Sequence, residues 1–275
     1  MASAERIFQA LDWDENVDEP AKPVELSERT AGQIEFKNLS FSYDDELPVL
    51  KDISLEIAAG EKLAVVGPTG SGKSTLIRLL GRFYNFQRGT IFLDGVDLLD
   101  LDSKDLRQRV GVVMQDFHIF SGSILDNITL GNPSISDEQG VKAARAVNAH
   151  SFIESLPEGY QTQLVERGQN LSQGQRQLLA FARVLAADPE ILVLDEATAS
   201  IDTETEEIIQ NALKIIMKGR TSILIAHRLK TIQEADRILV LKNGRVKEIG
   251  THDQLMANKD VYYTLSQLQF QDVSI

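Results

Sequence analysis

Residues 67–74 have the types and spacing of a loop that binds phosphate. They read Gly-Pro-Thr-Gly-Ser-Gly-Lys-Ser and match the pattern G-x-x-x-x-G-K-S/T at each required position. In such a loop the glycines let backbone N–H groups turn toward the phosphates, and the N-terminus of the next helix adds partial positive charge. We expect Lys73 to reach the β- and γ-phosphates and the Ser74 hydroxyl to ligate Mg²⁺.

The residues on either side predict the strand and the helix that such a loop needs. Residues 62–66 form a short apolar run typical of a buried strand, and residues 75–80 are helix formers that continue to Gly81. An ordinary glycine turn before a helix is the alternative interpretation. Because Lys73 and Ser74 stand in the correct register, we favour a nucleoside triphosphate site.

Two adjacent carboxylates, Asp195 and Glu196, end another buried strand, residues 191–194. Two negative charges side by side repel each other and lower stability, and a cation bound between or near them removes this repulsion. In phosphate-loop enzymes an Asp at this position holds Mg²⁺. We expect Asp195 to do so and Glu196 to polarise an attacking water. An exposed acidic turn is the alternative.

Three further side chains stand at predicted strand ends, which converge on the ligand edge of a parallel sheet. His227 would hydrogen-bond the γ-phosphate or the catalytic water, and the Gln115 amide would contact both Mg²⁺ and water. Tyr43 offers an aromatic face on which adenine could stack. For each of them an ordinary structural role is the alternative.

The composition limits the class of protein. The 275 residues are 43% hydrophobic and 25% charged, an ordinary globular composition for one large domain or two small ones. The absence of cysteine excludes disulfides, zinc–thiolate sites and thiol nucleophiles. The net charge of −13 argues against a nucleic-acid partner and against electrostatic adhesion to anionic lipid. No run of residues is long and apolar enough to cross a bilayer.

The predicted elements form an α/β core with two additions. The first addition is an antiparallel pair of strands, residues 34–43 and 49–57, of which the first alternates apolar and polar residues. Asn243-Gly244 marks a tight hairpin near the end of the chain. The buried strands of the core are residues 62–66, 111–115, 191–195 and 221–226, followed by 238–241 and 245–249.

The second addition is a helical insertion. Residues 122–187 contain no convincing strand, and stretches 124–130, 138–149 and 173–185 have helical spacing. Outside the insertion we expect a short helix whose last residues are 106–110, a helix over 203–217 and two terminal helices. Residues 14–32 are rich in Asp, Glu, Pro, Lys and Ser and are typical of a linker.

Residues 171–175, Leu-Ser-Gln-Gly-Gln, resemble the signature motif of ATP-binding cassette (ABC) proteins, usually Leu-Ser-Gly-Gly-Gln. The resemblance covers residues 34–268. The glycine loop matches Walker A, residues 191–196 match Walker B, Gln115 matches the Q-loop, His227 the switch histidine and Tyr43 the A-loop. Asp202 ends a stretch that resembles the D-loop, and residues 166–168 resemble the X-loop of exporters.

The resemblance implies a RecA-like P-loop NTPase core with an antiparallel β-subdomain and an inserted α-helical subdomain. We assign residues 1–32 to a linker from an absent transmembrane domain, 33–121 and 186–275 to the core with its β-subdomain, and 122–185 to the helical, signature subdomain. It implies ATP and Mg²⁺ as ligands, with Glu196, His227 and Gln115 as catalytic residues and Ser74, Gln115 and Asp195 as metal ligands. The implied ATP-binding residues are Tyr43, Val49, Gly67, Thr69, Gly70, Ser71, Gly72, Lys73, Ser74 and Thr75.

The resemblance also implies a second nucleotide-binding domain, packed head to tail against this one. Each ATP then lies between Walker A of one domain and the signature of the other, here Ser172, Gln173, Gly174 and Gln175. ATP would join the two domains and hydrolysis would release them, which powers transport by differential binding. Residues 3–8 and 119–124 resemble those of exporter half-transporters. We therefore expect a domain of a longer protein, held at the cytoplasmic face of the membrane by its own transmembrane domain and soluble when isolated.

One residue departs from the pattern, because Gln173 replaces the first signature glycine. Its side chain would crowd the γ-phosphate of the partner's ATP and leave the ATP bound at this chain's own Walker motifs unaffected. An asymmetric heterodimer fits this departure, and a homodimer that tolerates glutamine is the alternative.

Two other functions compete with transport. A non-transport ABC ATPase of DNA repair would carry a long coiled coil between Q-loop and signature, and a ribosomal one would carry two cassettes. The second competitor is a regulatory module that binds nucleotide without hydrolysing it, and Glu196 and His227 argue against it.

Overall fold

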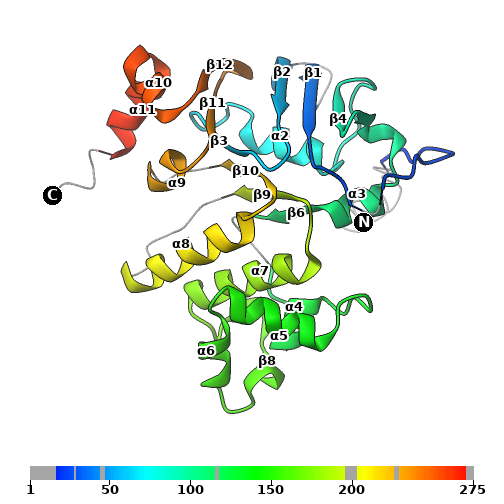
Figure 1. The fold of residues 1–275 in the computed structure, drawn as a ribbon, viewed down its shortest axis with the longest axis vertical. Helices are drawn as coiled ribbons and strands as arrows, with labels where there is room; N and C mark the ends of the chain where they lie inside the picture. The colour runs from blue at the N-terminus through cyan, green and yellow to red at the C-terminus, as the bar shows by residue number, and fades with distance from the viewer. Residues whose placement is uncertain are drawn as a thin grey trace, which may run out of the picture.

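The computed structural model describes residues 17–27, 29–43, 47–114, 118–195, 203–225 and 229–270. Figure 1 shows two sheets above a group of helices, with the C-terminal helices at one side. None of the helices within the described ranges combines the length and the apolar character that crossing a bilayer requires.

The smaller of the two main sheets is antiparallel, as predicted for the β-subdomain. It has four strands in the order β2-β1-β4-β5. In β1, buried and more exposed residues alternate over much of the strand, because one face of the sheet packs on the core. The strands are β1 (Ile34–Phe41), β2 (Leu50–Ile57), β4 (Ile91–Leu93) and β5 (Val96–Asp97).

The larger sheet has six strands in the order β12-β11-β3-β10-β9-β6. Its strands run parallel except for β12, which forms a hairpin with β11. Asn243 and Gly244 both have positive φ in that turn, 54° and 76°, as the Asn-Gly pair predicts. The strands are β3 (Lys62–Val66), β6 (Val110–Val113), β9 (Ile191–Asp195), β10 (Thr221–Ile225), β11 (Arg237–Lys242) and β12 (Arg245–Gly250).

The central strands read as continuous apolar runs because both faces of the larger sheet are covered. Leu63 and Val65 of β3 pack toward the antiparallel sheet, α2 (Lys73–Leu80) and α3 (Ser103–Arg109). Ala64 and Val66 point to the opposite side. There they meet α9 (Leu229–Gln233), α10 (His252–Asn258) and α11 (Val261–Phe270). The short helix α9 was not predicted.

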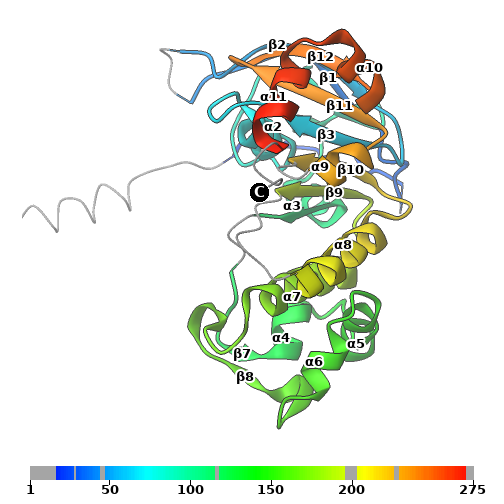
Figure 2. The ribbon, with the colours of Figure 1, turned by 90° about the vertical axis from the view of Figure 1, so that its left-hand side faces the viewer.

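The helical subdomain lies below the larger sheet in Figure 2, and α7 lies with α8 on the side that faces the sheet. Its core joins the sheet through Leu192, Leu194 and Leu224, which pack with residues of α7 and α8. The helices of the subdomain are α4 (Ile124–Thr129), α5 (Asp137–Ala146), α6 (His150–Glu154) and α7 (Gln173–Ala187), and α8 (Thr203–Met217) of the core packs against α7.

Two details of the prediction for this subdomain are wrong. Residues 122–187 do contain strands, since β7 (Gly122–Ser123) pairs with β8 (Gln163–Leu164). The helix expected over residues 138–149 ends at Ala146, and α6 begins separately at His150. Asn148 has a φ of 60°, in the left-handed region that asparagine tolerates, and this interrupts the helix.

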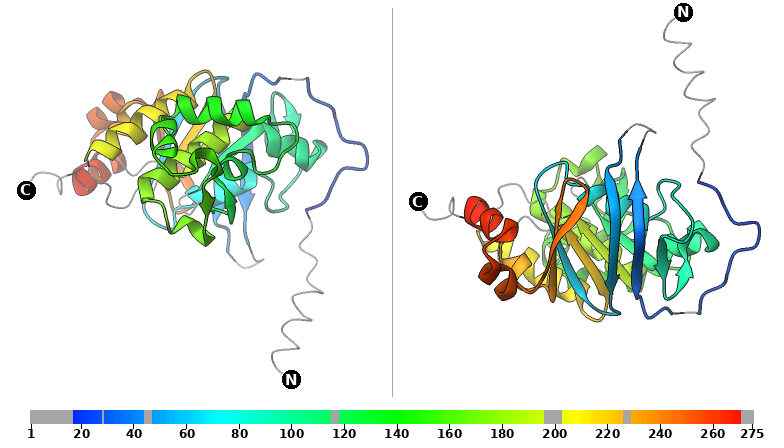
Figure 3. Two further views of the ribbon diagram at one scale, coloured as in Figure 1. Left: turned by 90° about the horizontal axis from the view of Figure 1, so that it is seen from below. Right: turned by 90° about the horizontal axis from the view of Figure 1, so that it is seen from above.

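Boundaries near the site also shift slightly. The strand β6 covers Val110–Val113, so Val110 belongs to the strand rather than to the helix before it. The strand β1 ends at Phe41, two residues before Tyr43. Residues 17–33, apart from residue 28, run along the outer edge of the core before entering β1 (Figure 3).

Candidate active site

A cavity of about 540 Å³ lies at the carboxyl end of the parallel strands β3, β9 and β10. It brings the glycine loop together with Tyr43 and Asp195, which are far apart in the sequence. Ile225 also lines it and was not predicted, because an apolar strand residue carries no chemical signal. The lining residues are Tyr43, Val49, Thr69, Gly70, Ser71, Gly72, Lys73, Ser74, Thr75, Asp195 and Ile225.

Glycine is required at two positions of the loop by its neighbours. Gly67 has a φ of 153°, and a Cβ placed on it would lie 2.1 Å from the carbonyl oxygen of Leu241. Gly72 has a φ of 104°, and its Cβ would lie 2.6 Å from Cδ2 of Leu50. The β11–β12 turn also touches the loop, since Gly244 N–H donates to the carbonyl of Ser71 at 3.2 Å. The sequence predicted this turn but not that it supports the loop.

Replacing Gly67 with alanine is expected to lower the free energy of unfolding by about 3 kcal/mol, because the added methyl group meets a backbone carbonyl that cannot rotate away. Urea denaturation without nucleotide measures this change. Gly70→Ala is the matched control. Gly70 also has positive φ, 77°, but nothing lies within 4 Å of its added Cβ, so only the backbone penalty of about 1–2 kcal/mol applies. Equal losses in the two variants would contradict the steric explanation.

Lys73 opens helix α2 and points back into the loop. Its ammonium donates to the carbonyl oxygens of Gly67, at 2.9 Å, and Pro68, at 3.1 Å. Burial lowers the pKa of Lys73, and the negative charge of Asp195 acts in the opposite direction. The two charged groups therefore act on each other across the cavity, where phosphate oxygens would meet the lysine.

The donor set in the cavity fits a magnesium ion. Ser74 provides a hydroxyl oxygen and Asp195 a carboxylate, and both line the same cavity as Lys73. Mg²⁺ prefers hard oxygen ligands and is commonly held by one or two carboxylates together with substrate phosphates. Within the described ranges no group of three or more acidic or histidine side chains is arranged to hold a metal by itself. A metal here would thus depend on the nucleotide for further ligands.

Tyr43 lines the cavity two residues after the end of β1. Its hydroxyl is 3.0 Å from Oγ1 of Thr75. Its ring meets Phe41 edge to face at 5.1 Å and Tyr84 at 5.0 Å between centroids. Tyr43 as a whole remains 42% exposed, and its aromatic ring could stack on a planar ligand in the cavity. Tyr84 was not predicted, and no motif marks it.

The signature residues lie on a different part of the molecule. Ser172 is the N-cap of α7, and its Oγ accepts from the N–H of Gln175 at 3.2 Å. The Gln175 side chain accepts in return from the N–H of Ser172 at 2.9 Å, which completes a capping box. Gly174 is required by packing, because its Cβ would lie 2.3 Å from Cγ2 of Thr205 in α8. Residues 172–175 are absent from the lining of the 540 Å³ cavity.

Four predicted residues, Gln115, Glu196, Asp202 and His227, lie outside the described residues, so their assignments stay predictions. The strands that lead to three of them do end together. Ile225 of β10 pairs with Asp195 of β9, and Val113 of β6 pairs with Leu194.

The signature helix is tied to the segment that follows Gln115. Arg183 of α7 donates to the carbonyl oxygens of Asn127, at 2.9 Å, and His118, at 3.0 Å. Burial lowers the pKa of Arg183. This arginine was not predicted, because a charged residue on a helix usually indicates a solvent-exposed face.

Known proteins share the sequence and the fold of this chain. The sequence profile of the family described as "ABC transporter" matches residues 50–199. The chain is 52% identical over 270 residues to the "Uncharacterized ABC transporter ATP-binding protein YknV" of Bacillus subtilis, covering 98% of this chain and 44% of that protein. It is 46% identical over 272 residues to the "ATP-dependent lipid A-core flippase" of Syntrophus aciditrophicus, covering 99% of this chain and 45% of the flippase.

A solved structure has the same fold. It is described as a bacterial Atm1-family ABC exporter with ATP bound, and it matches with a TM-score of 0.86 at 39% identity, covering 98% of this chain and 46% of the exporter chain. The chain thus spans less than half the length of these relatives. With the profile match, the identities and the fold taken together, the chain belongs to the ABC transporter family as an ATP-binding ATPase domain.

Proposed function

We propose that this domain hydrolyses ATP with Mg²⁺ at an interface with a second nucleotide-binding domain, and that hydrolysis powers export through a transmembrane domain of the same parent chain. The domain would then act at the cytoplasmic face of the membrane. The observation that carries the proposal is the separation of the two half-sites. The glycine loop and Asp195 line one cavity, whereas the signature residues 172–175 lie away from it.

Within its own half-site, the chain would supply the groups that bind and orient the nucleotide. Tyr43 would contact the base, Val49 the ribose and base, and Lys73 the β- and γ-phosphates. Ser74 and Asp195 would hold Mg²⁺, with Gln115 completing the set, and the metal would neutralise developing charge on the phosphate oxygens. Glu196 would accept the proton of the attacking water, and His227 would contact the γ-phosphate.

The signature residues of this chain would bind the ATP of the partner domain. The capping box uses the Ser172 hydroxyl as an acceptor, so its hydrogen can be donated to a phosphate oxygen of a partner's ATP. The helix behind it, Gln173–Ala187, adds the partial positive charge of its N-terminus. Gln173 is the first residue of this helix and is partly exposed, which places a side chain where the family usually has none.

The proposal predicts that ATP turnover per chain rises with protein concentration, because a complete site needs two domains. This is tested by steady-state ATPase rates measured over about a hundredfold range of protein concentration that spans the dissociation constant of the dimer. The expected increase is about tenfold or more when dimers are scarce at the low end. Turnover per chain that stays constant over the whole range would contradict a shared site.

The same assay decides between a homodimer and an asymmetric pair. In a homodimer that tolerates glutamine, the chain hydrolyses ATP by itself, and Gln173→Gly is expected to leave turnover within about twofold of the wild type. In an asymmetric pair, activity appears only when the chain is mixed with a second half-transporter subunit that has a complete signature.

A further inference from the structure

Arg82 carries a buried positive charge just beyond the helix that starts with Lys73. Its side chain has no exposed surface. The guanidinium donates to the carbonyl oxygens of Leu101, at 2.5 Å, and Leu98, at 3.3 Å. Moving a charge out of water costs free energy. A buried arginine is therefore stable only while its hydrogen-bond and ion-pair partners remain in contact with it.

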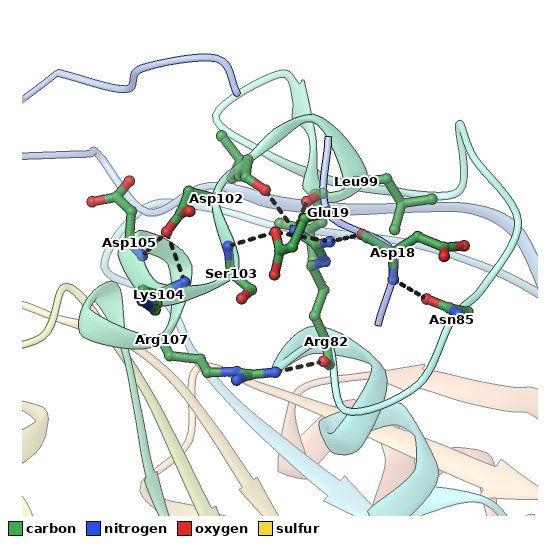
Figure 4. Close-up of polar contacts among 12 residues, drawn as sticks. Asp18, Glu19, Arg82, Asn85, Leu99, Asp102, Ser103, Lys104, Asp105 and Arg107 are labelled. Carbon is green, nitrogen blue, oxygen red and sulfur yellow. Dashed lines mark hydrogen bonds and ion pairs between the residues drawn. The ribbon is translucent and has the colours of Figure 1, made fainter. Parts of the chain in front are cut away.

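The remaining partners of Arg82 come from the N-terminal segment. Its Nη2 donates to the carbonyl oxygen of Asp18 at 2.6 Å and lies 3.6 Å from the Glu19 carboxylate. Among the described residues, Glu19 is the acidic side chain within ion-pair distance of Arg82. Figure 4 shows the guanidinium between the two residues, with Glu19 on the side of α3 near Ser103 and Asp18 on the opposite side near Asn85.

The backbone of Arg82 is held in an unfavourable conformation. Its φ is 49°, in the left-handed region that helix ends usually give to glycine. The amide of Phe83 donates to the carbonyl of Arg78, and that of Arg82 donates to Leu79, which is the pattern of a Schellman cap. Gly81, directly before it, does not take this position. A side chain at this place is tolerated when its contacts outweigh the strain.

We call residues 17–27 and 29–33 the strap, because hydrogen bonds fasten them to the core along their length. Asp18 N–H donates to Oδ1 of Asn85 at 3.1 Å, and Glu19 accepts from the N–H of Ser103 at 3.3 Å. Further along, Val24 N–H donates to the carbonyl of Asp100 at 2.7 Å. The amides of Gly32 and Gln33 both donate to the Asp94 carboxylate, at 3.2 and 2.7 Å.

Arg82 therefore joins three parts of the chain. It follows α2, which runs about 12 Å from Lys73 as a rigid helix. Leu98 and Leu101 lie just before α3, which leads through β6 toward Gln115. Arg107 of α3 donates to the carbonyl oxygen of Arg82 at 3.1 Å and so closes the cluster. The third part is the strap.

We propose that Arg82 is a positioning residue that fastens the strap to the far end of the nucleotide-binding helix, so that ATP bound at Lys73 changes how tightly the strap is held. The coupling rests on the proposed function, in which the strap leads to the transmembrane domain. The anchor itself rests only on the buried contacts between Arg82, Asp18 and Glu19.

Hydrogen exchange of peptides from residues 17–27, measured on the 275-residue chain by mass spectrometry, tests both parts. Without nucleotide, Arg82→Gln and Glu19→Gln are each expected to accelerate exchange about tenfold or more, because the strap opens more often. Arg88→Gln is the matched control, since Arg88 is an exposed arginine of the same region that pairs with Asp100. Its exchange is expected to stay within about twofold of the wild type.

The second arm adds saturating ATP with Mg²⁺ and follows ATP binding by equilibrium dialysis in the same samples. ATP is expected to slow strap exchange about threefold or more in the wild type, and this response is expected to vanish in Arg82→Gln. Strap exchange in Glu19→Gln equal to that in the wild type would overturn the anchor, even if Arg82→Gln fails to fold. An ATP response that persists in a folded Arg82→Gln chain would overturn the coupling. A wild-type chain that binds no ATP contradicts both the proposed function and the coupling. The exchange rates of the strap measured without nucleotide still test whether Arg82 anchors the strap.

Discussion

Replacing Lys73 with alanine is expected to lower ATP turnover by about a hundredfold or more, and to weaken ATP binding, because a preorganised cation facing the transferred phosphate is lost. Lys73 is the only cationic side chain among the described residues that line the 540 Å³ cavity. Its removal also takes away a positive charge that interacts with Asp195. The negative charge of the site would then oppose a triphosphate.

Steady-state ATPase rates and the binding of a fluorescent ATP analogue measure the two effects of Lys73→Ala separately. Lys62→Ala is the control, because Lys62 begins the strand whose other end leads into the glycine loop. It removes the same charge from the opposite edge of the sheet and is expected to leave both measurements within about twofold. Turnover in Lys73→Ala above half that of the wild type would contradict the role given to this lysine.

Replacing Glu196 with glutamine is expected to reduce turnover by about a hundredfold or more while ATP still binds, because the base for the attacking water is lost. Glu196 itself lies outside the described residues. Its neighbour Asp195 ends β9 and lines the cavity, at the edge of a parallel sheet where ligands bind. With hydrolysis blocked, ATP-joined dimers should accumulate.

Single-turnover hydrolysis and size-exclusion chromatography with ATP and Mg²⁺ test the Glu196→Gln prediction. Glu207→Gln, an exposed glutamate on α8, is the matched control and should behave as the wild type does. Turnover that is unchanged in Glu196→Gln would place the general base elsewhere. A wild-type chain that binds ATP without hydrolysing it would instead favour the regulatory module.

The core could be predicted from the sequence because its strands are short, apolar and buried on both faces. The predicted bounds of β3, β9 and α8 agree with the structure residue for residue. At the ends of these elements the hydrophobic pattern changes where a glycine, a charged residue or a polar turn occurs, so the local composition is sufficient to predict their bounds. The glycine loop was found in the same way, since its chemistry needs particular residues at adjacent positions.

Contacts between distant segments could not be predicted in this way. The strands β7 and β8 have two residues each and pair across about forty positions of the chain, so neither has a periodic pattern. Residues 17–27 and 29–32 belong to the stretch predicted as a linker and yet make hydrogen bonds to the core through backbone groups. A backbone carbonyl or amide carries no sequence signal, because each residue has one.

The sequence by itself determined the chemistry of this protein, a phosphate-binding loop with an acidic strand end and a signature motif, because those functions depend on residue type and local spacing. Only the tertiary structure decided which residues share a cavity. It placed Tyr43 and Asp195 with the glycine loop, it placed Ser172 and its neighbours elsewhere, and it buried Arg82 against Asp18 and Glu19. The physical reason is that these relations depend on how sheets and helices pack, which is set by many apolar contacts together.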